Sequence, residues 1–235
     1  MKKLLLPILL SISFLCSSQT AMDYYGKGAY KSNFGEYSEA VKYFNKAIEI
    51  NSQFVEAYYV RGHCKYKLND FRGGLQDCNK AIEINPKSGE SYHARGIIKY
   101  KLQDYRGALY DFNKALEFLP VFNRDIKYKR GCAKSRLQDY RGAIQEFDEL
   151  IKDYNGFEEA FIERGKAKSE LGDDKGAIQD YNNAIKKNPQ SSLAYYYRGL
   201  SKRILGDING SCLDFSKAGE LGDMDAYDLI KKYCN

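Results

Sequence analysis

The pattern of small, apolar and polar positions along the chain repeats six times. Each copy has a glycine, and successive glycines are 34 or 35 residues apart: Gly28, Gly62, Gly96, Gly131, Gly165 and Gly199. Twelve positions after each glycine lies a small residue: Ala40, Gly74, Ala108, Ala143, Ala177 and Ser211. Four positions further lies a core residue: Phe44, Cys78, Phe112, Phe147, Tyr181 and Phe215. Three positions beyond that lies a second core residue: Ala47, Ala81, Ala115, Leu150, Ala184 and Ala218. Spacings of four and three place these side chains on one face of a helix.

Each copy is predicted to fold as two antiparallel helices joined by a short polar turn. In the second copy the helices cover Tyr58–Leu68 and Phe71–Ile84. Small residues at facing positions let the two helices approach closely, and the large residue fills the space beside them. In five copies an aspartate stands where the second helix begins, a favourable N-cap: Asp70, Asp104, Asp139, Asp173 and Asp207. In three copies a proline follows the second helix and stops it: Pro86, Pro120 and Pro189.

These residues resemble the tetratricopeptide repeat (TPR) family, whose 34-residue helix–turn–helix unit carries glycine, alanine, phenylalanine, alanine and proline at these offsets. The resemblance covers residues 21–225, in units 21–54, 55–88, 89–122, 124–157, 158–191 and 192–225. It implies an all-α, right-handed superhelical solenoid of six helix pairs. Residues 226–235 are predicted to form a capping helix, the thirteenth, in which Tyr227, Leu229, Ile230 and Tyr233 cover the apolar face of the last repeat.

Several positions depart from the family pattern. The family's tryptophan is tyrosine in four copies, at Tyr24, Tyr58, Tyr92 and Tyr195; it is replaced by Phe161 in the fifth and by Lys127 in the fourth. The family's tyrosine inside the first helix is lysine in every copy: Lys31, Lys65, Lys99, Lys134, Lys168 and Lys202. An extra residue falls near Val121–Arg124, where we expect a local irregularity.

An arginine and an acid recur together in five copies. The arginines each precede the repeat glycine: Arg61, Arg95, Arg130, Arg164 and Arg198. The acids each lie sixteen positions later: Asp77, Asp111, Glu146, Asp180 and Asp214. The first copy has Lys27 and Tyr43 instead, so the two residue types are absent together. We interpret the pairs as structural ion pairs between the two helices. The alternative is a ladder of ligand-binding arginines.

The N-terminus has the layout of a secretory signal peptide. Lys2 and Lys3 precede an apolar run from Leu4 to Leu15, and small and polar residues follow. Cleavage after Ser18 is predicted, which makes residues 1–18 the signal and the protein exported, to the periplasm or cell envelope of a Gram-negative bacterium. Two alternatives are a lipid anchor on Cys16, against which Leu15 argues, and a buried N-terminal helix. The apolar run is too short for a permanent membrane span, and no later segment is apolar enough.

Composition argues against most kinds of chemistry. The formal net charge is +6, too small a surplus to indicate nucleic-acid binding. His63 and His93 lie far apart in sequence without other ligands at metal spacing, so no metal or cofactor is expected. His63 adjoins Cys64, but neighbouring residues of a helix point apart, which disfavours a catalytic pair. The mature chain has an odd number of cysteines and no CxxC motif; one pair can still oxidise, and the pairing stays open: Cys64, Cys78, Cys132, Cys212 and Cys234.

The resemblance implies that the first helix of each repeat lines a concave groove. The inward positions, with Tyr prominent among them, are Tyr25, Tyr59, His63, Tyr66, His93, Tyr100, Tyr128, Lys166, Tyr196 and Arg203. Tyrosine offers a large contact area and a hydroxyl, which suits peptide or protein binding. The alternative is that some of these tyrosines only pack between repeats. The Lys and Asn that clamp acidic chaperone tails in some family members are Tyr25 and Ala29 here. We predict a non-catalytic scaffold that binds a protein or peptide. The rivals are an accessory subunit of an envelope enzyme or secretion complex and an RNA-binding repeat protein.

Overall fold

Helices joined by short turns make up the protein, and no described residue lies in a β-strand. The structure is a computed structural model that describes residues 20–119, 121 and 124–234. The predicted signal peptide, the lipid-anchor alternative at Cys16 and the predicted role of Pro120 lie outside these residues. No described helix is long and apolar enough to cross a membrane.

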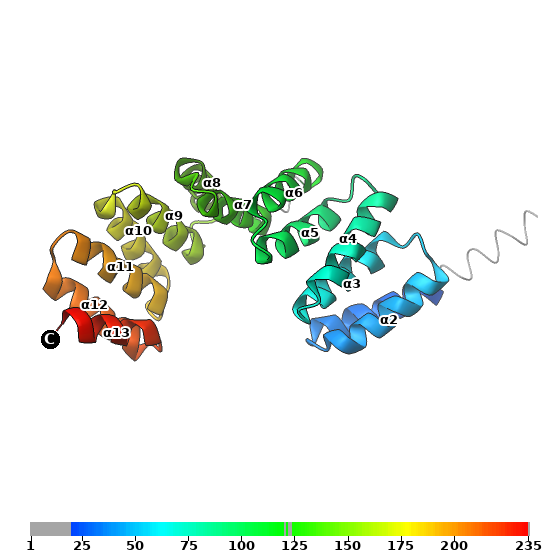
Figure 1. The fold of residues 1–235 in the computed structure, drawn as a ribbon, viewed down its shortest axis with the longest axis horizontal. Coiled ribbons are helices and arrows are strands. Elements are labelled where there is room, and N and C mark those ends of the chain that lie inside the picture. Colours follow the sequence, from blue (N-terminus) through cyan, green and yellow to red (C-terminus); the bar gives the residue numbers. More distant parts are fainter. Residues whose placement is uncertain (1–19, 120, 122–123, 235) are drawn as a thin grey trace, which may run out of the picture. The chain divides into compact units, whose positions relative to one another are not determined.

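The chain divides between Phe122 and Asn123 into two compact units (Figure 1). This division coincides with the segment in which the extra residue lies. The first unit contains a helical stretch over 20–33, α2 (Tyr37–Ile50), α3 (Val55–Lys67), α4 (Phe71–Ile84), α5 (Gly89–Lys101) and α6 (Tyr105–Phe118). The second unit contains α7 (Arg124–Arg136), α8 (Tyr140–Asp153), α9 (Glu158–Glu170), α10 (Asp174–Lys187), α11 (Ser192–Ile204), α12 (Ile208–Glu220) and α13 (Met224–Tyr233). The described residues therefore contain the thirteen predicted helices.

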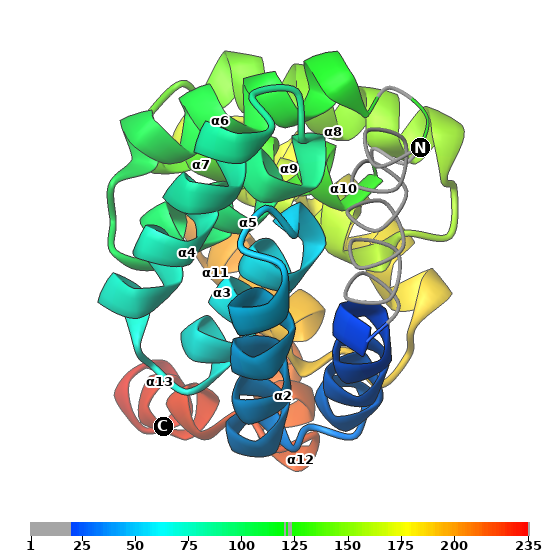
Figure 2. The same ribbon diagram turned by 90° about the vertical axis from the view of Figure 1, so that its right-hand side faces the viewer.

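Within each unit the two helices of a repeat lie side by side, and each second helix also contacts the first helix of the next repeat (Figures 1 and 2). This arrangement confirms the all-α repeat solenoid for each unit.

The predicted aspartate caps explain where the second helices begin. The side chain of Asp70 accepts a hydrogen bond from the backbone N–H of Gly73, with a distance of 2.9 Å. The same bond, three residues apart, recurs at four other aspartates: Asp104, Asp139, Asp173 and Asp207. In the first repeat the cap position is Glu36, which makes no such bond. Each aspartate thus satisfies a backbone donor that the helix leaves unpaired.

The repeat glycines let the core aromatic ring lie directly against the first helix. A Cβ atom on Gly96 would lie 2.7 Å from Cε1 of Phe112, and one on Gly165 would lie 2.6 Å from Cε1 of Tyr181. The six core residues are at most 1 % exposed: Phe44, Cys78, Phe112, Phe147, Tyr181 and Phe215. No larger side chain fits at these glycines without displacing the ring. The packing of the ring therefore fixes how closely the two helices of a repeat approach.

The second repeat fills its core differently. Cys78 replaces the usual aromatic ring, and Gly74 replaces the usual alanine. Ile98, which is 1 % exposed, reaches in from α5, and its Cδ1 would lie 2.9 Å from a Cβ placed on Gly74. Tyr59 and Tyr66 pack against the same cluster. The smaller residues of one repeat are therefore compensated by a larger residue of the next.

The C-terminal helix α13 covers the last repeat, as predicted. Leu229 and Ile230 pack against the cluster formed by Phe215, Ala218 and Ala226. The predicted cap residue Tyr227 is 50 % exposed but donates a hydrogen bond from its hydroxyl to the carbonyl oxygen of Gly219 at 3.1 Å. A disulfide between Cys212 and Cys234 fastens the end of this helix to α12. The pairing that the sequence left open is thus Cys212 with Cys234.

Candidate partner-binding face

The first helices of neighbouring repeats contact one another within each unit and so build a continuous surface. In the first unit α3 contacts α5; in the second, α7 contacts α9 and α9 contacts α11. We call this surface of each unit its first-helix face. The predicted groove residues all lie on these helices or on the stretch over 20–33.

On the first unit the face is aromatic and carries the two histidines of the chain. Tyr66 lies 6.0 Å, between ring centroids, from His63 on the same helix. Tyr59 is half-buried beside the Cys78–Ile98 cluster, and burial raises the pKa of its hydroxyl. Burial lowers the pKa of His63, and the nearby charges of Lys67 and His93 lower it further. A neutral imidazole is therefore favoured at this face near neutral pH.

The neighbouring repeat continues this aromatic surface. His93 lies 6.2 Å from Phe112, and Tyr100 lies 5.2 Å from Tyr105 in an edge-to-face arrangement. Both residues are partly exposed. The structure thus places the five predicted residues Tyr59, His63, Tyr66, His93 and Tyr100 on two adjacent helices, α3 and α5.

Two other predicted tyrosines, partly buried like Tyr59, pack between repeats. Tyr25 lies 5.7 Å from Phe44 in its own repeat and 5.0 Å from Phe54 at the start of the next. Tyr128 has the same surroundings in the fourth repeat, with Phe147 at 6.1 Å and Phe157 at 5.2 Å. Burial raises the pKa of both hydroxyls. These two tyrosines help to join successive repeats, which is the alternative that the sequence left open.

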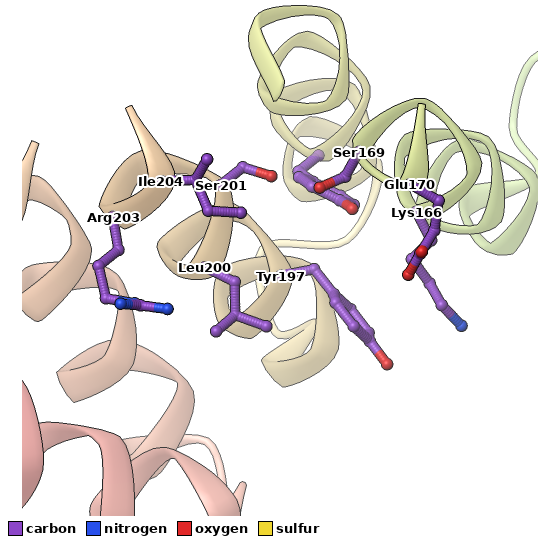
Figure 3. Close-up of a pocket in the computed structure, with 9 residues that line it drawn as sticks. Lys166, Ser169, Glu170, Tyr197, Leu200, Ser201, Arg203 and Ile204 are labelled. Carbon is purple, nitrogen blue, oxygen red and sulfur yellow. The ribbon is translucent and has the colours of Figure 1, made fainter. Parts of the chain in front are cut away.

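Tyr196 also faces a core. Its ring lies 6.2 Å from that of Phe215, and it packs against the cluster that α13 covers. Its neighbour Tyr197 instead lines a pocket between α9 and α11 (Figure 3). Tyr197 was not among the residues predicted from the sequence. The run of three tyrosines from Tyr195 to Tyr197 signalled an aromatic surface there, but only the packing shows which one faces the pocket.

The pocket on the second unit has a volume of about 240 Å³ and contains two cations, Lys166 and Arg203. Lys166 donates a hydrogen bond to Glu163 at 2.8 Å, and its Nζ lies 5.1 Å from the centroid of the Tyr197 ring. Burial lowers the pKa of Lys166, but the charge of Glu163 and this hydrogen bond raise it more, so the lysine stays protonated. Leu200 and Ile204 add apolar surface.

Arg203 differs from the half-buried arginines of the bridges because it makes no hydrogen bond or ion pair to any described residue. Its Nε is buried without an acceptor. Its guanidinium carbon lies 4.4 Å from the centroid of the Tyr233 ring, on the capping helix. A stacked but unpaired guanidinium beside a pocket is a natural partner for an anionic group.

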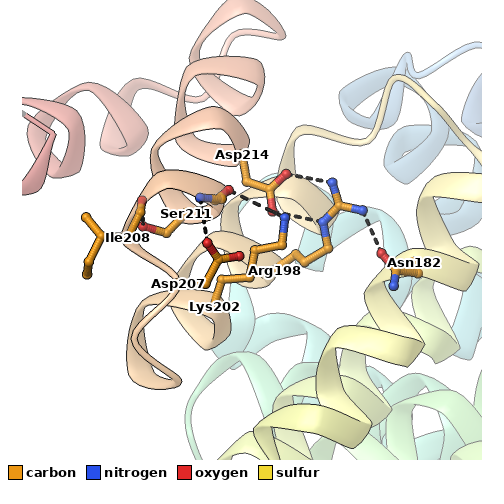
Figure 4. Close-up of polar contacts among 8 residues, drawn as sticks. Asn182, Arg198, Lys202, Asp207, Ile208, Ser211 and Asp214 are labelled. Carbon is orange, nitrogen blue, oxygen red and sulfur yellow. Dashed lines mark hydrogen bonds and ion pairs between the residues drawn. The ribbon is translucent and has the colours of Figure 1, made fainter.

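The predicted arginine–acid pairs are confirmed as structural bridges in the described residues. In the last repeat, Nε and Nη2 of Arg198 donate to the two carboxylate oxygens of Asp214, at 2.9 and 2.6 Å (Figure 4). Lys202 pairs with the same carboxylate at 2.8 Å. The bidentate bond recurs between Arg61 and Asp77, Arg95 and Asp111, and Arg164 and Asp180, whereas Arg130 donates to Glu146 through Nη2.

The bridging arginines have further partners that were not predicted from the sequence. Nη1 of Arg198 donates to Asn182 in the preceding repeat at 2.6 Å (Figure 4). The same bond to the preceding repeat joins Arg61 to Asn45, Arg95 to Asn79 and Arg164 to Asp148. The acceptor lies sixteen positions before the arginine each time, so its signal was present in the sequence. Each of these arginines therefore binds both its own repeat and the one before.

The other candidate functional groups are the cysteines outside the disulfide and the potential metal ligands. Cys64 is buried, donates a weak hydrogen bond to Ser32 at 3.4 Å, and has a pKa raised by burial. A nucleophilic thiol needs the opposite shift. Cys78 and Cys132 are buried and unbonded to each other. In the described part of the chain, no three His, Cys, Asp or Glu side chains are gathered as they would be around a metal ion.

Comparison with known proteins identifies the family. Tetratricopeptide repeat profiles match residues 24–54, 55–88, 125–154 and 159–191, which together are more than half of the chain. The chain belongs to the tetratricopeptide repeat family. No curated protein is significantly similar to it in sequence.

Solved structures of other proteins, two of them described as TPR proteins, share the fold. YrrB, described as a TPR protein with an unusual peptide-binding site, is 21 % identical with a TM-score of 0.65, over 80 % of this chain and 97 % of YrrB. A tetratricopeptide repeat protein from Parabacteroides merdae is 21 % identical with a TM-score of 0.68, over 92 % of this chain and 84 % of that one. PilF of Pseudomonas aeruginosa is 12 % identical with a TM-score of 0.79, over 92 % and 98 %. At these identities the similarity shows the fold.

Proposed function

We propose that this TPR protein is a non-catalytic scaffold that binds a peptide or protein segment along its first-helix faces. The observation that carries this proposal is the aromatic surface on α3 and α5, where Tyr59, Tyr66 and Tyr100 are partly exposed. Partly exposed tyrosines on rigid helices lose little conformational freedom on binding, so they suit hot spots of a protein interface. YrrB, which has the same fold, is described as having a peptide-binding site.

The second unit contributes a different kind of contact to the same function. Its pocket between α9 and α11 offers Lys166 and Arg203 next to Tyr197. A TPR array spreads its binding energy over several repeats rather than one pocket, with a few residues dominating. An acidic group of a partner matches the pocket of this unit, as an apolar group matches the aromatic surface of the first unit.

Replacement of the aromatic surface tests this proposal. The partner would be captured by crosslinking to the mature protein in native cell envelope, and its affinity then measured by calorimetry. The double variant Tyr59→Ala with Tyr100→Ala should lose about 2 kcal/mol or more of binding free energy. The control is Tyr110→Ala, since Tyr110 is 54 % exposed on α6, away from the first helices. Circular dichroism must show unchanged helical content. Equal affinity of the double variant and the wild type would place the binding surface elsewhere.

We further propose that the protein is exported and acts in the bacterial cell envelope. Two observations support this: the basic and apolar sequence at Lys2–Leu15, and the disulfide between Cys212 and Cys234. Disulfides persist in oxidising compartments such as the periplasm. Mass spectrometry of the protein from its native host should find Gln19 at the N-terminus. Acylation at Cys16 would instead establish a lipoprotein, and an intact Met1 would contradict export by a cleaved signal.

A further inference from the structure

The pocket on the second unit contains an arginine whose charge no described residue neutralises. Lys166 has Glu163 as its partner, Ser169 donates to Asp174 at 2.7 Å, and Glu170 accepts a hydrogen bond from Tyr140 at 3.4 Å. Arg203 has only the face of the Tyr233 ring. An unpaired guanidinium in a half-buried position is unfavourable unless an acceptor reaches it, so the free protein leaves this interaction for a ligand.

The surroundings of Arg203 indicate which part of a ligand binds there. Leu200, Ile204 and the ring of Tyr197 line the same pocket, together with the polar residues Ser169, Glu170 and Ser201 (Figure 3). An anion at Arg203 therefore has apolar groups beside it as well as polar ones. A volume of about 240 Å³ accommodates one or two side chains. Helix α7 packs against α9 on one side of the pocket, and residues of α11 pack against α13 on the other. The helices that flank α9 and α11 thus extend this face beyond the pocket, and a segment that lay along it would place a side chain rather than a chain end in the pocket.

The position of Arg203 depends on the capping helix. Tyr233 is followed directly by Cys234, which is bonded to Cys212 of α12. Tyr233 is near the end of α13, a helix in which Ala226 alone is buried among its residues. A terminal turn with so little buried surface frays readily, and the disulfide restrains it. The disulfide thus keeps the Tyr233 ring at 4.4 Å from the guanidinium.

We propose that the pocket between α9 and α11 binds an aspartate or glutamate side chain of the partner, and that the disulfide-bonded capping helix positions Arg203 for this contact. The inference rests on the proposed peptide-binding function and names the chemistry of one of its contacts. The carboxylate pairs with Arg203, and the neighbouring apolar side chain of the partner lies on Leu200 and Tyr197. Tyr233 and the disulfide are positioning groups that act through Arg203.

A peptide library tests the ligand chemistry without knowledge of the partner. Random-sequence peptides displayed with free C-termini are selected on the oxidised mature protein, and the enriched sequences are synthesised. Each is compared with its Asp→Asn or Glu→Gln form and with its C-terminal amide. The acid-to-amide change in the side chain should lower affinity about tenfold, and Arg203→Gln should lower it equally with no further loss when both changes are combined. Arg141→Gln, an exposed arginine on α8, is the control and should leave affinity unchanged.

The outcomes separate the pocket from the function as a whole. If no peptide is enriched, the peptide-binding function itself fails. If peptides bind but neither their acidic side chains nor Arg203 matters, the pocket assignment is overturned while peptide binding stands. If only the C-terminal amide weakens binding, the ligand is a chain end, which also overturns the assignment.

Separate variants test whether Tyr233 and the disulfide position Arg203. Tyr233→Leu removes the ring, Tyr233→Phe keeps it, and Cys212→Ser with Cys234→Ser removes the disulfide. Tyr233→Leu and the disulfide-free protein should lose several-fold affinity for acidic peptides, whereas Tyr233→Phe should bind like the wild type. These losses should disappear in the Arg203→Gln background, which a merely structural role would not produce. Full affinity in the disulfide-free protein would overturn the positioning role.

Discussion

Repeats two and three, residues 55–118, and repeats five and six, residues 158–220, use the same frame for different surfaces. In both regions a bidentate arginine–aspartate bridge joins the helices of each repeat, and an aspartate caps each second helix. On this frame, repeats two and three present tyrosine and histidine side chains, while repeats five and six present a pocket with Lys166 and Arg203. The difference shows that the buried frame fixes the backbone and leaves the exposed first-helix positions free to vary.

The cores of the two regions also differ. Cys78 occupies the position that Phe215 occupies in the sixth repeat, and Ile98 from the following repeat fills the remaining space. The aromatic surface therefore lies over a core with fewer large side chains in its own repeat. The cationic pocket lies over cores with full aromatic rings, Tyr181 and Phe215.

The largest expected effect is on the free energy of unfolding, and it distinguishes the core of the sixth repeat from that of the second. Phe215→Ala should lower the free energy of unfolding by about 3–5 kcal/mol, because it removes a fully buried ring and leaves a cavity. Cys78→Ala removes only one buried sulfur and should cost about 1 kcal/mol. Chemical denaturation followed by circular dichroism measures both. Similar losses for the two variants would show that the second repeat depends on its own core residue as much as the sixth does.

The second prediction concerns the frame that both regions share. Arg95→Met should cost about 3 kcal/mol because it leaves Asp111, which is 0 % exposed, with Lys99 as its remaining cation. Adding Asp111→Asn should recover part of this loss, since the unpaired charge is then removed. Arg198→Met should behave alike in the other region. A double-mutant cycle with coupling near zero for either pair would show that the bridge does not stabilise that repeat.

The third prediction uses pH to perturb the first region alone, because both histidines of the chain lie there. The pKa of His63 is lowered in the folded protein by burial and by Lys67 and His93. Protonation therefore favours the unfolded state: the stability from neutral His63 is complete above its ordinary pKa of about 6.5 and is lost as the pH falls below it. The loss approaches, at most, about 1.4 kcal/mol per pH unit.

Hydrogen exchange at about pH 7.5 and about pH 5.5 measures this effect locally. After correction for the intrinsic exchange rate, protection of α3 should fall at the lower pH while that of α11 stays the same. In His63→Gln the fall in α3 should be smaller. An equal fall in both helices would trace the pH dependence to groups outside the histidine pair.

The smallest effect is expected in the turns between the helices. Gln103 between α5 and α6 has a φ of 63°, whereas the corresponding residue between α11 and α12 is Gly206, with a φ of 84°. Left-handed backbone costs a non-glycine residue about 1 kcal/mol. Gly206→Gln should therefore lower the melting temperature slightly, and Gln103→Gly should raise it or leave it unchanged. A clear loss in Gln103→Gly would show that its side chain contributes more than its strain costs.

Most of the fold followed from local rules. The aspartate caps, the glycine-to-ring contacts and the arginine–acid bridges were predicted from spacing because each depends on residues at a fixed offset within one repeat. The acceptors in the preceding repeat, such as Asn182 for Arg198, recur at a fixed offset too, but they were not predicted because each lies outside the repeat of its arginine. For the site, the sequence placed Tyr59, Tyr66 and Tyr100 on first helices but did not show which tyrosines, such as Tyr25 and Tyr128, also pack between repeats.

The amino-acid sequence by itself determined the number of repeats, the start of the second helix in five of them and the core residue of each, because these depend on periodic side-chain size and on capping within 34 residues. It did not determine where the first helices begin: the helix predicted over Tyr58–Leu68 covers Val55–Lys67. Only the tertiary structure decided that Cys212 bonds to Cys234 and that Tyr197 rather than Tyr196 faces the pocket. It also decided that Arg203 stacks on Tyr233 without a carboxylate. These contacts join residues whose separation follows no repeat, so the rotation of each helix against its neighbours determines them, and a periodic pattern does not specify that rotation.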